Sequence, residues 1–190
     1  MKSNTLILVT IAAIFAGGVF IWDRQQSSQP QTEAEATGTA IFTFSEDEVQ
    51  RLTVITPTQT LTFKKVTDGP SAWAMETPEA GPADEAALLF LINLLATAQS
   101  QRTLNVASAQ QQDFGLDQPT TVEVVLNNQQ THTLILGDKD YEGGAVYARV
   151  DPIKTETQSW AVELVPTSFL DAVSRPLAEW KAPLQKSNDS

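Results

Sequence analysis

The chain contains a single histidine, which is its most obvious candidate for acid–base chemistry. His132 alternates with Leu134 on a predicted β-hairpin whose first strand carries Val124. An imidazole exchanges protons near neutral pH, but covalent hydrolysis also needs a nucleophile beside it. The chain has no cysteine, and no serine lies in a recognisable nucleophile elbow. We therefore predict that His132 is a surface or cross-strand residue.

A run of alternating carboxylates is the second candidate for chemistry. Asp138, Asp140 and Glu142 alternate with other residues ahead of a glycine pair at 143–144. Alternating oxygen ligands before a glycine suggest calcium. The run lacks the distal bidentate glutamate of an EF-hand loop, however, and Lys139 interrupts it. The interpretation that we favour is the solvated tip of a hairpin.

The third group of candidates is an acidic stretch among prolines ahead of a predicted helix: Glu76, Glu79, Asp84 and Glu85. Acid–base catalysis by carboxylates needs two of them in one cleft with separated pKa values. Asp84 is predicted to cap the helix, and the others are predicted to be exposed. The glycine pair noted above lacks the lysine and the helix of a phosphate-binding loop. We assign no catalytic, cofactor-binding or metal-ligating residue and expect a protein that is not an enzyme.

The overall composition excludes several classes of protein. The 190 residues include 12 Lys and Arg against 23 Asp and Glu, which gives a formal net charge of −11. Nucleic acid is a poor partner for such an acidic chain, because its phosphates call for clustered basic residues. The lack of cysteine excludes disulfides and iron–sulfur clusters, and one histidine cannot form a multi-histidine metal site. A hydrophobic content of 42% is enough for a folded core.

The start of the chain, residues 1–24, is predicted to be a transmembrane anchor. Residues 3–22 carry no charge, and as a helix they would extend about 30 Å, the thickness of a bilayer's hydrocarbon core. Lys2 precedes the span, which favours a cytoplasmic N-terminus and a remainder exported to the periplasm or a thylakoid lumen. The alternative is a cleaved signal peptide, for which residues 16–18 offer small side chains. The apolar run continues to Trp22, which favours an uncleaved, single-pass anchor in the inner or thylakoid membrane.

Three regions are predicted to follow the anchor. Residues 25–40 contain no large apolar side chain and are predicted to be a flexible tether. Residues 41–181 are predicted to form the exported domain, and residues 182–190 a disordered tail. A domain of this length buries about 70% of its unfolded surface, enough to be stable by itself.

The exported domain is predicted to contain two units with the same order of elements. Alternating β-branched residues, turn residues and caps carry this prediction. The first unit has a strand at 41–44, a helical turn at 45–48, hairpin strands at 52–56 and 60–63, a strand at 73–75 and a helix at 84–100. The second has a helical turn at 110–114 ended by Gly115, hairpin strands at 121–126 and 131–136, strands at 146–150 and 160–162, and a helix at 168–175 capped by Thr167.

The predicted fold class is therefore α+β, with a mainly antiparallel sheet built from two hairpin-plus-strand units, each followed by a helix, behind an N-terminal transmembrane helix. Residues 60–63 and 133–136 match at an offset of 73, which a decayed duplication or the general similarity of hairpins would explain. Trp160 and Trp180 are predicted to pack in the core. One helix face is predicted to pack on the first hairpin, through Leu88, Leu91, Ile92 and Leu95.

Several short motifs in this domain resemble a known family. They are Trp73-x-Met75 before Pro78, Pro82-Ala83-Asp84 at the start of the helix, Phe114-Gly115-Leu116-Asp117-x-Pro119, Leu134-x-Leu136-Gly137-Asp138 and Tyr147-x-Arg149. Together with the N-terminal span, they resemble the bacterial family called domain of unknown function 4340, over roughly residues 44–169. The Phe-Gly-Leu-Asp-x-Pro element is the most specific of these motifs.

The resemblance implies a single-pass, exported α+β domain with no assigned enzymatic activity. Members are often encoded near ABC-type transport components, including those linked to gliding motility, and some occur in cyanobacteria. The family offers no agreed catalytic residues, so none is transferred to this chain. Its recurrent residues imply structural roles: Gly115 and Gly137 as turn formers, Leu116 and Trp73 in the core, and Pro119 at the start of a strand.

We expect a non-enzymatic, membrane-tethered accessory or assembly subunit of a membrane protein complex, acting outside the cytoplasm. Its expected partners are the bilayer, through residues 3–22, and that complex, but not nucleic acid. The alternative is a small-ligand or glycan-binding module of a transport system, which a polar pocket between the two β units would support. A hydrolase that uses the scattered carboxylates is a third hypothesis, which two carboxylates in one deep cleft would support.

Overall fold

The computed structural model describes residues 38–153 and 158–183 of the chain. The predicted anchor at 1–24, the tether up to residue 37 and the tail from residue 184 lie outside the described residues. Within the described ranges, no helix has both the length and the hydrophobicity needed to cross a membrane. The last residues of the predicted tether do have regular structure, because Thr39–Ala40 form strand β1, which pairs with β6, Gln99–Ser100.

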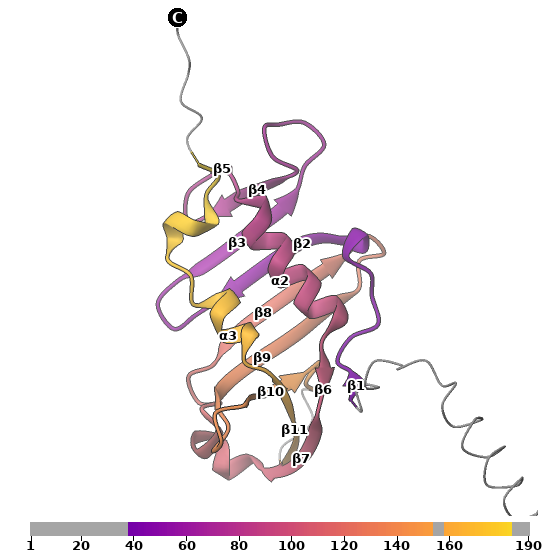
Figure 1. Cartoon of the computed structure of the whole chain (residues 1–190), viewed down its shortest axis with the longest axis vertical. Helices are drawn as coiled ribbons and strands as arrows, with labels where there is room; N and C mark the ends of the chain where they lie inside the picture. The colour runs from indigo at the N-terminus through magenta and orange to yellow at the C-terminus, as the bar shows by residue number, and fades with distance from the viewer. Residues whose placement is uncertain (1–37, 154–157, 184–190) are drawn as a thin grey trace, which may run out of the picture. The chain divides into compact units, whose positions relative to one another are not determined.

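The domain is built on a nine-stranded antiparallel sheet with the order β5-β4-β3-β2-β8-β9-β10-β11-β7 (Figure 1). Its strands are β2 (Val49–Ile55), β3 (Thr60–Lys65), β4 (Trp73–Thr77), β5 (Gly81–Pro82), β7 (Arg102–Ala107), β8 (Thr120–Leu126), β9 (Thr131–Lys139), β10 (Ala145–Val150) and β11 (Ser159–Pro166). The α+β fold with a mainly antiparallel sheet is confirmed.

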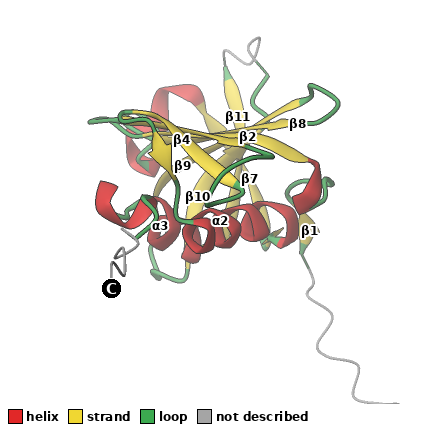
Figure 2. Ribbon diagram, turned by 90° about the horizontal axis from the view of Figure 1, so that it is seen from above, coloured by secondary structure: helices red, strands yellow, loops and turns green. Residues whose placement is uncertain are grey.

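The strand order places the two hairpin units on either side of a central pair, β2 and β8, in which Leu52 lies opposite Val124. From this pair, β3, β4 and β5 follow on one side, and β9, β10 and β11 on the other. Each set precedes a helix in the chain, α2 (Glu85–Thr97) or α3 (Ser168–Val173). Both helices lie on the same face of the sheet (Figure 2). Counted outward from the centre, the two units therefore have the same order of elements.

Side-chain capping explains where two of the helical segments begin. The Asp84 carboxylate accepts a hydrogen bond from the Ala87 amide at 2.8 Å, which starts α2. The predicted capping box is also present: the Ser45 amide donates to the Glu48 carboxylate at 2.7 Å, at the start of the 3-10 turn η1 (Glu46–Glu48). Two further 3-10 segments are η2 (Ser108–Phe114) and η3 (Leu177–Trp180).

The structure differs from the sequence prediction at several boundaries. Residues 41–44 are extended but belong to no sheet strand, and their alternation reflects the burial of Phe42 and Phe44. Helix α2 ends at Thr97 rather than 100, because the chain enters β6. The predicted helix at 168–175 ends at Val173, and the side chain of Thr167 does not cap it. Strands β5 and β7 were not predicted.

The main core lies between the sheet and its two helices. Leu88, Leu91, Ile92 and Leu95 of α2 are fully buried, as predicted, in one cluster with the side chains of the β2–β3 hairpin. Trp180 is also fully buried, and its ring lies 5.3 Å from that of Phe63. This cluster extends across both halves of the sheet, since it includes residues of β2, β3, β4, β8, β9 and β10.

A second, smaller cluster lies on the opposite face of the sheet and covers only the second half. Val106, Val162 and Leu116 are its buried members, with Phe114 packed against them. The Phe114 ring meets Tyr147 edge-on at 4.8 Å, at the end of η2. On the first half, the same face carries mostly polar side chains, such as Arg51, Thr53, Thr62, Lys64 and Glu76. The described helical segment on this face, η2, contacts β7 and β9 of the second half.

Candidate functional site

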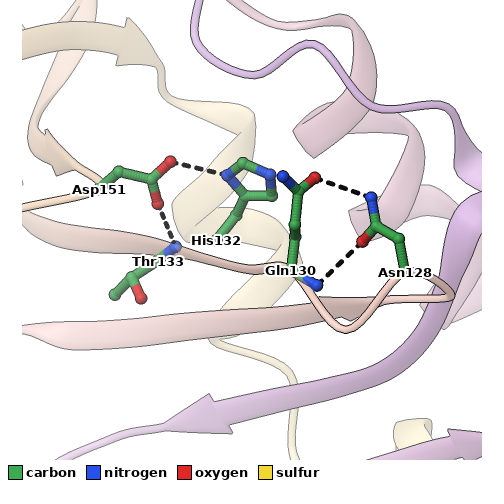
Figure 3. Close-up of polar contacts among 5 residues, drawn as sticks. All are labelled: Asn128, Gln130, His132, Thr133 and Asp151. Atoms are coloured by element: carbon green, nitrogen blue, oxygen red, sulfur yellow. Dashed lines mark hydrogen bonds and ion pairs between the residues drawn. The ribbon is translucent and has the colours of Figure 1, made fainter.

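The clearest arrangement of chemically competent groups is the pair formed by His132 and Asp151 (Figure 3). His132 lies near the start of β9, and Asp151 follows the neighbouring strand β10. The His132 Nδ1 atom lies 2.7 Å from one Asp151 carboxylate oxygen, and the Thr133 amide donates to the other at 2.7 Å. The Asp151 backbone has a φ of 42°, a left-handed conformation that Asp tolerates better than most residues. Both oxygens of this carboxylate are therefore engaged.

The other surroundings of His132 are aromatic. The ring centroids of Phe42 and Phe44 lie 5.2 and 5.5 Å from that of the imidazole. Both phenylalanines are buried, and they belong to the extended segment that leads from β1 to η1. His132 thus connects this incoming segment to the β8–β9 hairpin and, through Asp151, to β10.

The pair has the geometry of the histidine and aspartate of a catalytic triad. A carboxylate on Nδ1 fixes the imidazole tautomer and leaves the other ring nitrogen as the possible base. A base also needs a substrate or nucleophile within hydrogen-bond reach. None of the larger hollows whose walls are fully described is lined by His132. The contacts of His132 within the described residues are those of a residue that holds elements together.

Three carboxylates of the acidic stretch have structural partners of their own. Glu76 on β4 bridges two basic side chains, Arg51 at 2.5 Å and Lys64 at 3.0 Å. The Lys64 hydrogen bond, and the charges of both bases, lower the pKa of Glu76 despite an opposing contribution from burial. Glu79 pairs with Lys181 at 2.5 Å, and Asp84 caps α2. Glu85 is exposed in the first turn of α2.

The alternating carboxylates at 138–142 lie at the β9–β10 hairpin, and the structure gives Asp140 a turn-forming role. The Ala145 amide donates to the Asp140 side chain at 2.8 Å, and the Gly143 amide donates to the Asp140 carbonyl at 2.9 Å. Tyr141 at the tip is completely exposed. Among the described residues, no three His, Cys, Asp or Glu side chains gather closely enough to hold a metal ion.

The glycines of the recurrent motifs mark a close backbone approach. A Cβ atom on Gly137 in β9 would lie 2.1 Å from the Phe114 carbonyl oxygen. A Cβ atom on Gly115 would lie 2.4 Å from the Asp138 side chain, and Gly115 has a φ of 66°. The two motifs therefore meet, because the end of η2 lies directly on β9. Gly115 ends η2, as predicted, whereas Gly137 permits contact and forms no turn.

A sizeable hollow among the described residues lies away from His132, at the N-terminal end of α2. It has a volume of about 520 Å³ and is lined by Pro70, Ser71, Pro82, Ala83, Asp84, Glu85, Ala86, Ala182 and Pro183. Most of these residues belong to the first unit and the C-terminal segment, so the hollow is not between the two β units. Its size is within the range of small-ligand sites, and its walls are mainly proline and alanine.

Sequence reasoning missed the partners of His132. Asp151 comes directly after a predicted strand, where an acidic residue most often means a solvated turn. Phe42 and Phe44 were interpreted as strand residues. The weak signal was that the neighbouring strands 131–136 and 146–150 place His132 and Asp151 at the same end of a β-meander.

Comparison with known proteins gives one match. The model of the family described as "Domain of unknown function (DUF4340)" matches residues 73–184, from β4 to the C-terminal segment. No curated protein and no solved structure matches significantly. The matched range covers more than half of the chain and includes all the motifs quoted above, from Trp73 to Arg149. The chain therefore belongs to the DUF4340 family.

Proposed function

We propose that this chain is a non-enzymatic, membrane-tethered subunit of a membrane protein complex, and that its domain acts outside the cytoplasm. The observation that carries the proposal is how the candidate catalytic groups are engaged. Glu76, Glu79, Asp84 and Asp140 each hold a different structural contact, and His132 packs between two strands and an aromatic segment. These structural contacts support the proposal of a binding surface.

The tethered location rests on the sequence. The uncharged residues 3–22 have the length of a membrane span, and Lys2 favours the cytoplasmic side for the N-terminus. A tether confines the domain near the membrane and raises its effective concentration toward partners there. Membership of a family without an assigned activity is consistent with this role.

The surface of α2 offers a place where a partner could bind. Leu89 and Phe90 are 41% and 42% exposed, and the Arg175 guanidinium lies 5.4 Å from the Phe90 ring centroid. Exposed aromatic and arginine side chains are frequent at the centres of protein interfaces.

To test the proposal, the tagged full chain is solubilised in mild detergent and the proteins that co-purify are identified. A Phe90→Ala variant should lose them, and a Tyr141→Ala variant on the distant hairpin should keep them. A chain that purifies alone from its own membranes would contradict the proposal.

The second candidate function is small-ligand or glycan binding. The hollow of about 520 Å³ at the N-terminal end of α2 favours it. Its walls are poor in hydrogen-bond donors, so we rank this function below partner binding. Thermal-shift measurements of the full chain against a set of sugars and amines, with Ser71→Trp as a variant that fills the hollow, distinguish the two functions. A ligand that stabilises the wild type but not the variant would favour the second.

A further inference from the structure

The two edge strands of the nine-stranded sheet, β5 and β7, differ in how far other segments of the chain cover them (Figure 1). At one end, β5 has two residues and contains Pro82. The segment after η3 covers it: the Ala182 amide donates to the Pro82 carbonyl at 3.0 Å, the Asp84 amide donates to the Trp180 carbonyl at 2.9 Å, and Ala83 bridges Lys181. This edge is short, contains a proline and is closed by the chain's own C-terminal segment.

The other edge, β7, is less protected: β1 pairs with β6 just ahead of it, but no strand of the described residues pairs with the outer side of β7 itself. It is six residues long, and it pairs with β11 on one side only. Its sequence, Arg-Thr-Leu-Asn-Val-Ala, contains no proline or glycine and has a single charge at its first position. Natural proteins usually protect such an edge with charges, prolines, bulges or a covering segment, because unpaired backbone groups recruit another strand.

The pairing of β7 with β11 fixes which backbone groups point outward. The Ser108 amide donates to the Gln158 carbonyl at 2.9 Å, just beyond the strand. Hydrogen-bonded pairs alternate along an antiparallel ladder, so residues 104 and 106 also bond to β11. The N–H and C=O groups of Thr103, Asn105 and Ala107 therefore point away from the sheet. All three residues are exposed.

We propose that β7 pairs with β7 of a second copy of this chain, antiparallel, with the two-fold axis at Asn105. The proposal goes beyond the proposed function and does not depend on it. Two edge strands can pair only when residues whose backbone N–H and C=O groups point outward lie opposite each other. An axis at Asn105 fulfils this condition, since Asn105 meets Asn105 and Thr103 meets Ala107, so all three outward residues are used.

The second copy is favoured over other strands because this register is self-complementary. Leu104 and Val106 lie on the face of the second cluster, where Leu104 is half-buried and Val106 is buried. In the paired edges, Leu104 of each copy lies beside Val106 of the other, so the two clusters become continuous. Arg102 lies opposite Ser108, so no like charges oppose each other despite the acidic composition of the chain.

Disulfide trapping tests the register directly, because the wild-type chain has no cysteine. In the proposed dimer, the two Asn105 Cα atoms are about 5.5 Å apart, within the range that a disulfide spans. Full-length Asn105→Cys in mild detergent should therefore become a covalent dimer on mild oxidation. Asn128→Cys, at the exposed β8–β9 turn, is the matched control and should stay largely monomeric. Equal cross-linking of the two variants, or cross-linking of Asn105→Cys only to another protein, would overturn the proposal.

A proline at the axis tests whether backbone pairing holds the dimer. Asn105→Pro removes an outward N–H and leaves the bonds to β11 in place, as proline at an edge strand allows. Analytical ultracentrifugation of the full chain should give two copies for the wild type and for Asn105→Ser, and one copy for Asn105→Pro. A monomeric wild type, or a dimer that survives the proline, would overturn the proposal. If the proline variant does not fold, the cysteine pair decides.

Discussion

The two halves of the sheet share one order of strands but differ on the face that the helices leave open. In the second half, η2 covers this face, and Phe114, Leu116 and Tyr147 form a second apolar cluster there. In the first half, the face has no described cover, and Arg51, Lys64 and Glu76 form an ion-pair group on it. One half is thus packed from both sides and the other from one side.

The difference comes from the segments that connect the strands. The second half follows a stretch in which η2 and Gly115 return the chain onto β9, and Gly137 permits the close contact. The first half follows η1, which packs beside α2 instead: the side-chain amide of Asn93 donates to the Glu46 carboxylate at 2.7 Å. Equal topology therefore does not give equal packing. Because the uncovered face meets solvent, it carries polar side chains.

The largest effect is expected where both halves depend on the same core. Leu91 is fully buried under α2, so Leu91→Ala should lower the free energy of unfolding by about 2–5 kcal/mol. Leu89→Ala on the same helix is the matched control, because its side chain is 41% exposed, and it should cost much less. Urea denaturation measures both. A loss below about 0.5 kcal/mol for Leu91→Ala would contradict the burial of Leu91 in the core that both halves share.

A smaller effect, confined to the second half, is expected at Gly137. Gly137→Ala places a Cβ atom against the Phe114 carbonyl oxygen, so η2 must move, at a cost of about 1–3 kcal/mol. Gly144→Ala on the neighbouring hairpin meets nothing within 4 Å and should be nearly neutral. Urea denaturation of both variants measures the difference. Identical stability of the two variants would contradict the close contact of η2 with β9.

The smallest effect is expected on the open face of the first half. Glu76→Gln breaks an exposed ion-pair group and should cost less than about 1 kcal/mol at pH 7. Because folding lowers the pKa of Glu76, its carboxylate stabilises the fold above the pKa of the unfolded chain. This contribution disappears as the pH falls through the lower, folded pKa.

The matched control for this group is Glu123→Gln, on the same face but without an ion pair among the described residues. Because protonation of Glu76 removes its contribution, the stability of the wild type should fall more steeply between pH 5 and pH 3 than that of Glu76→Gln. The Glu123→Gln protein should follow the wild type. If all three chains lose stability in parallel, the ion-pair group on the open face has no energetic role.

Periodic patterns predicted much of the fold because the elements that they describe are long and local. The hairpin at 52–63, the buried face of α2 and the capping box at Ser45 all follow from alternation or from cap residues. The DUF4340 membership was also predicted, from short motifs whose glycines are fixed by contact between η2 and β9.

Features that depend on distant contacts could not be predicted in this way. Strand β7 has only two apolar residues in alternation, and its place beside β11 is set by topology. The His132–Asp151 pair joins residues 19 positions apart across two strands, and Phe42 and Phe44 reach it from a segment without sheet pairing. No local pattern encodes such meetings, because tertiary packing decides them.

We propose that the domain works as a tethered binding surface and not as an enzyme. The most direct measurement is complementation of a deletion strain by three variants of the full chain. The first is His132→Ala, the second is Glu79→Gln, and the third has a cleavable export signal in place of residues 2–22. Removing a general acid or base typically slows a reaction by about 10²–10⁴-fold, whereas removing a tether lowers effective concentration.

The two point variants should complement the deletion whenever they are folded and present in the membrane. The untethered chain should complement poorly, even when it is exported in equal amount. A folded, membrane-bound His132→Ala protein that fails to complement would contradict the non-enzymatic claim. Full complementation by the untethered chain would contradict the claim that function depends on the tether.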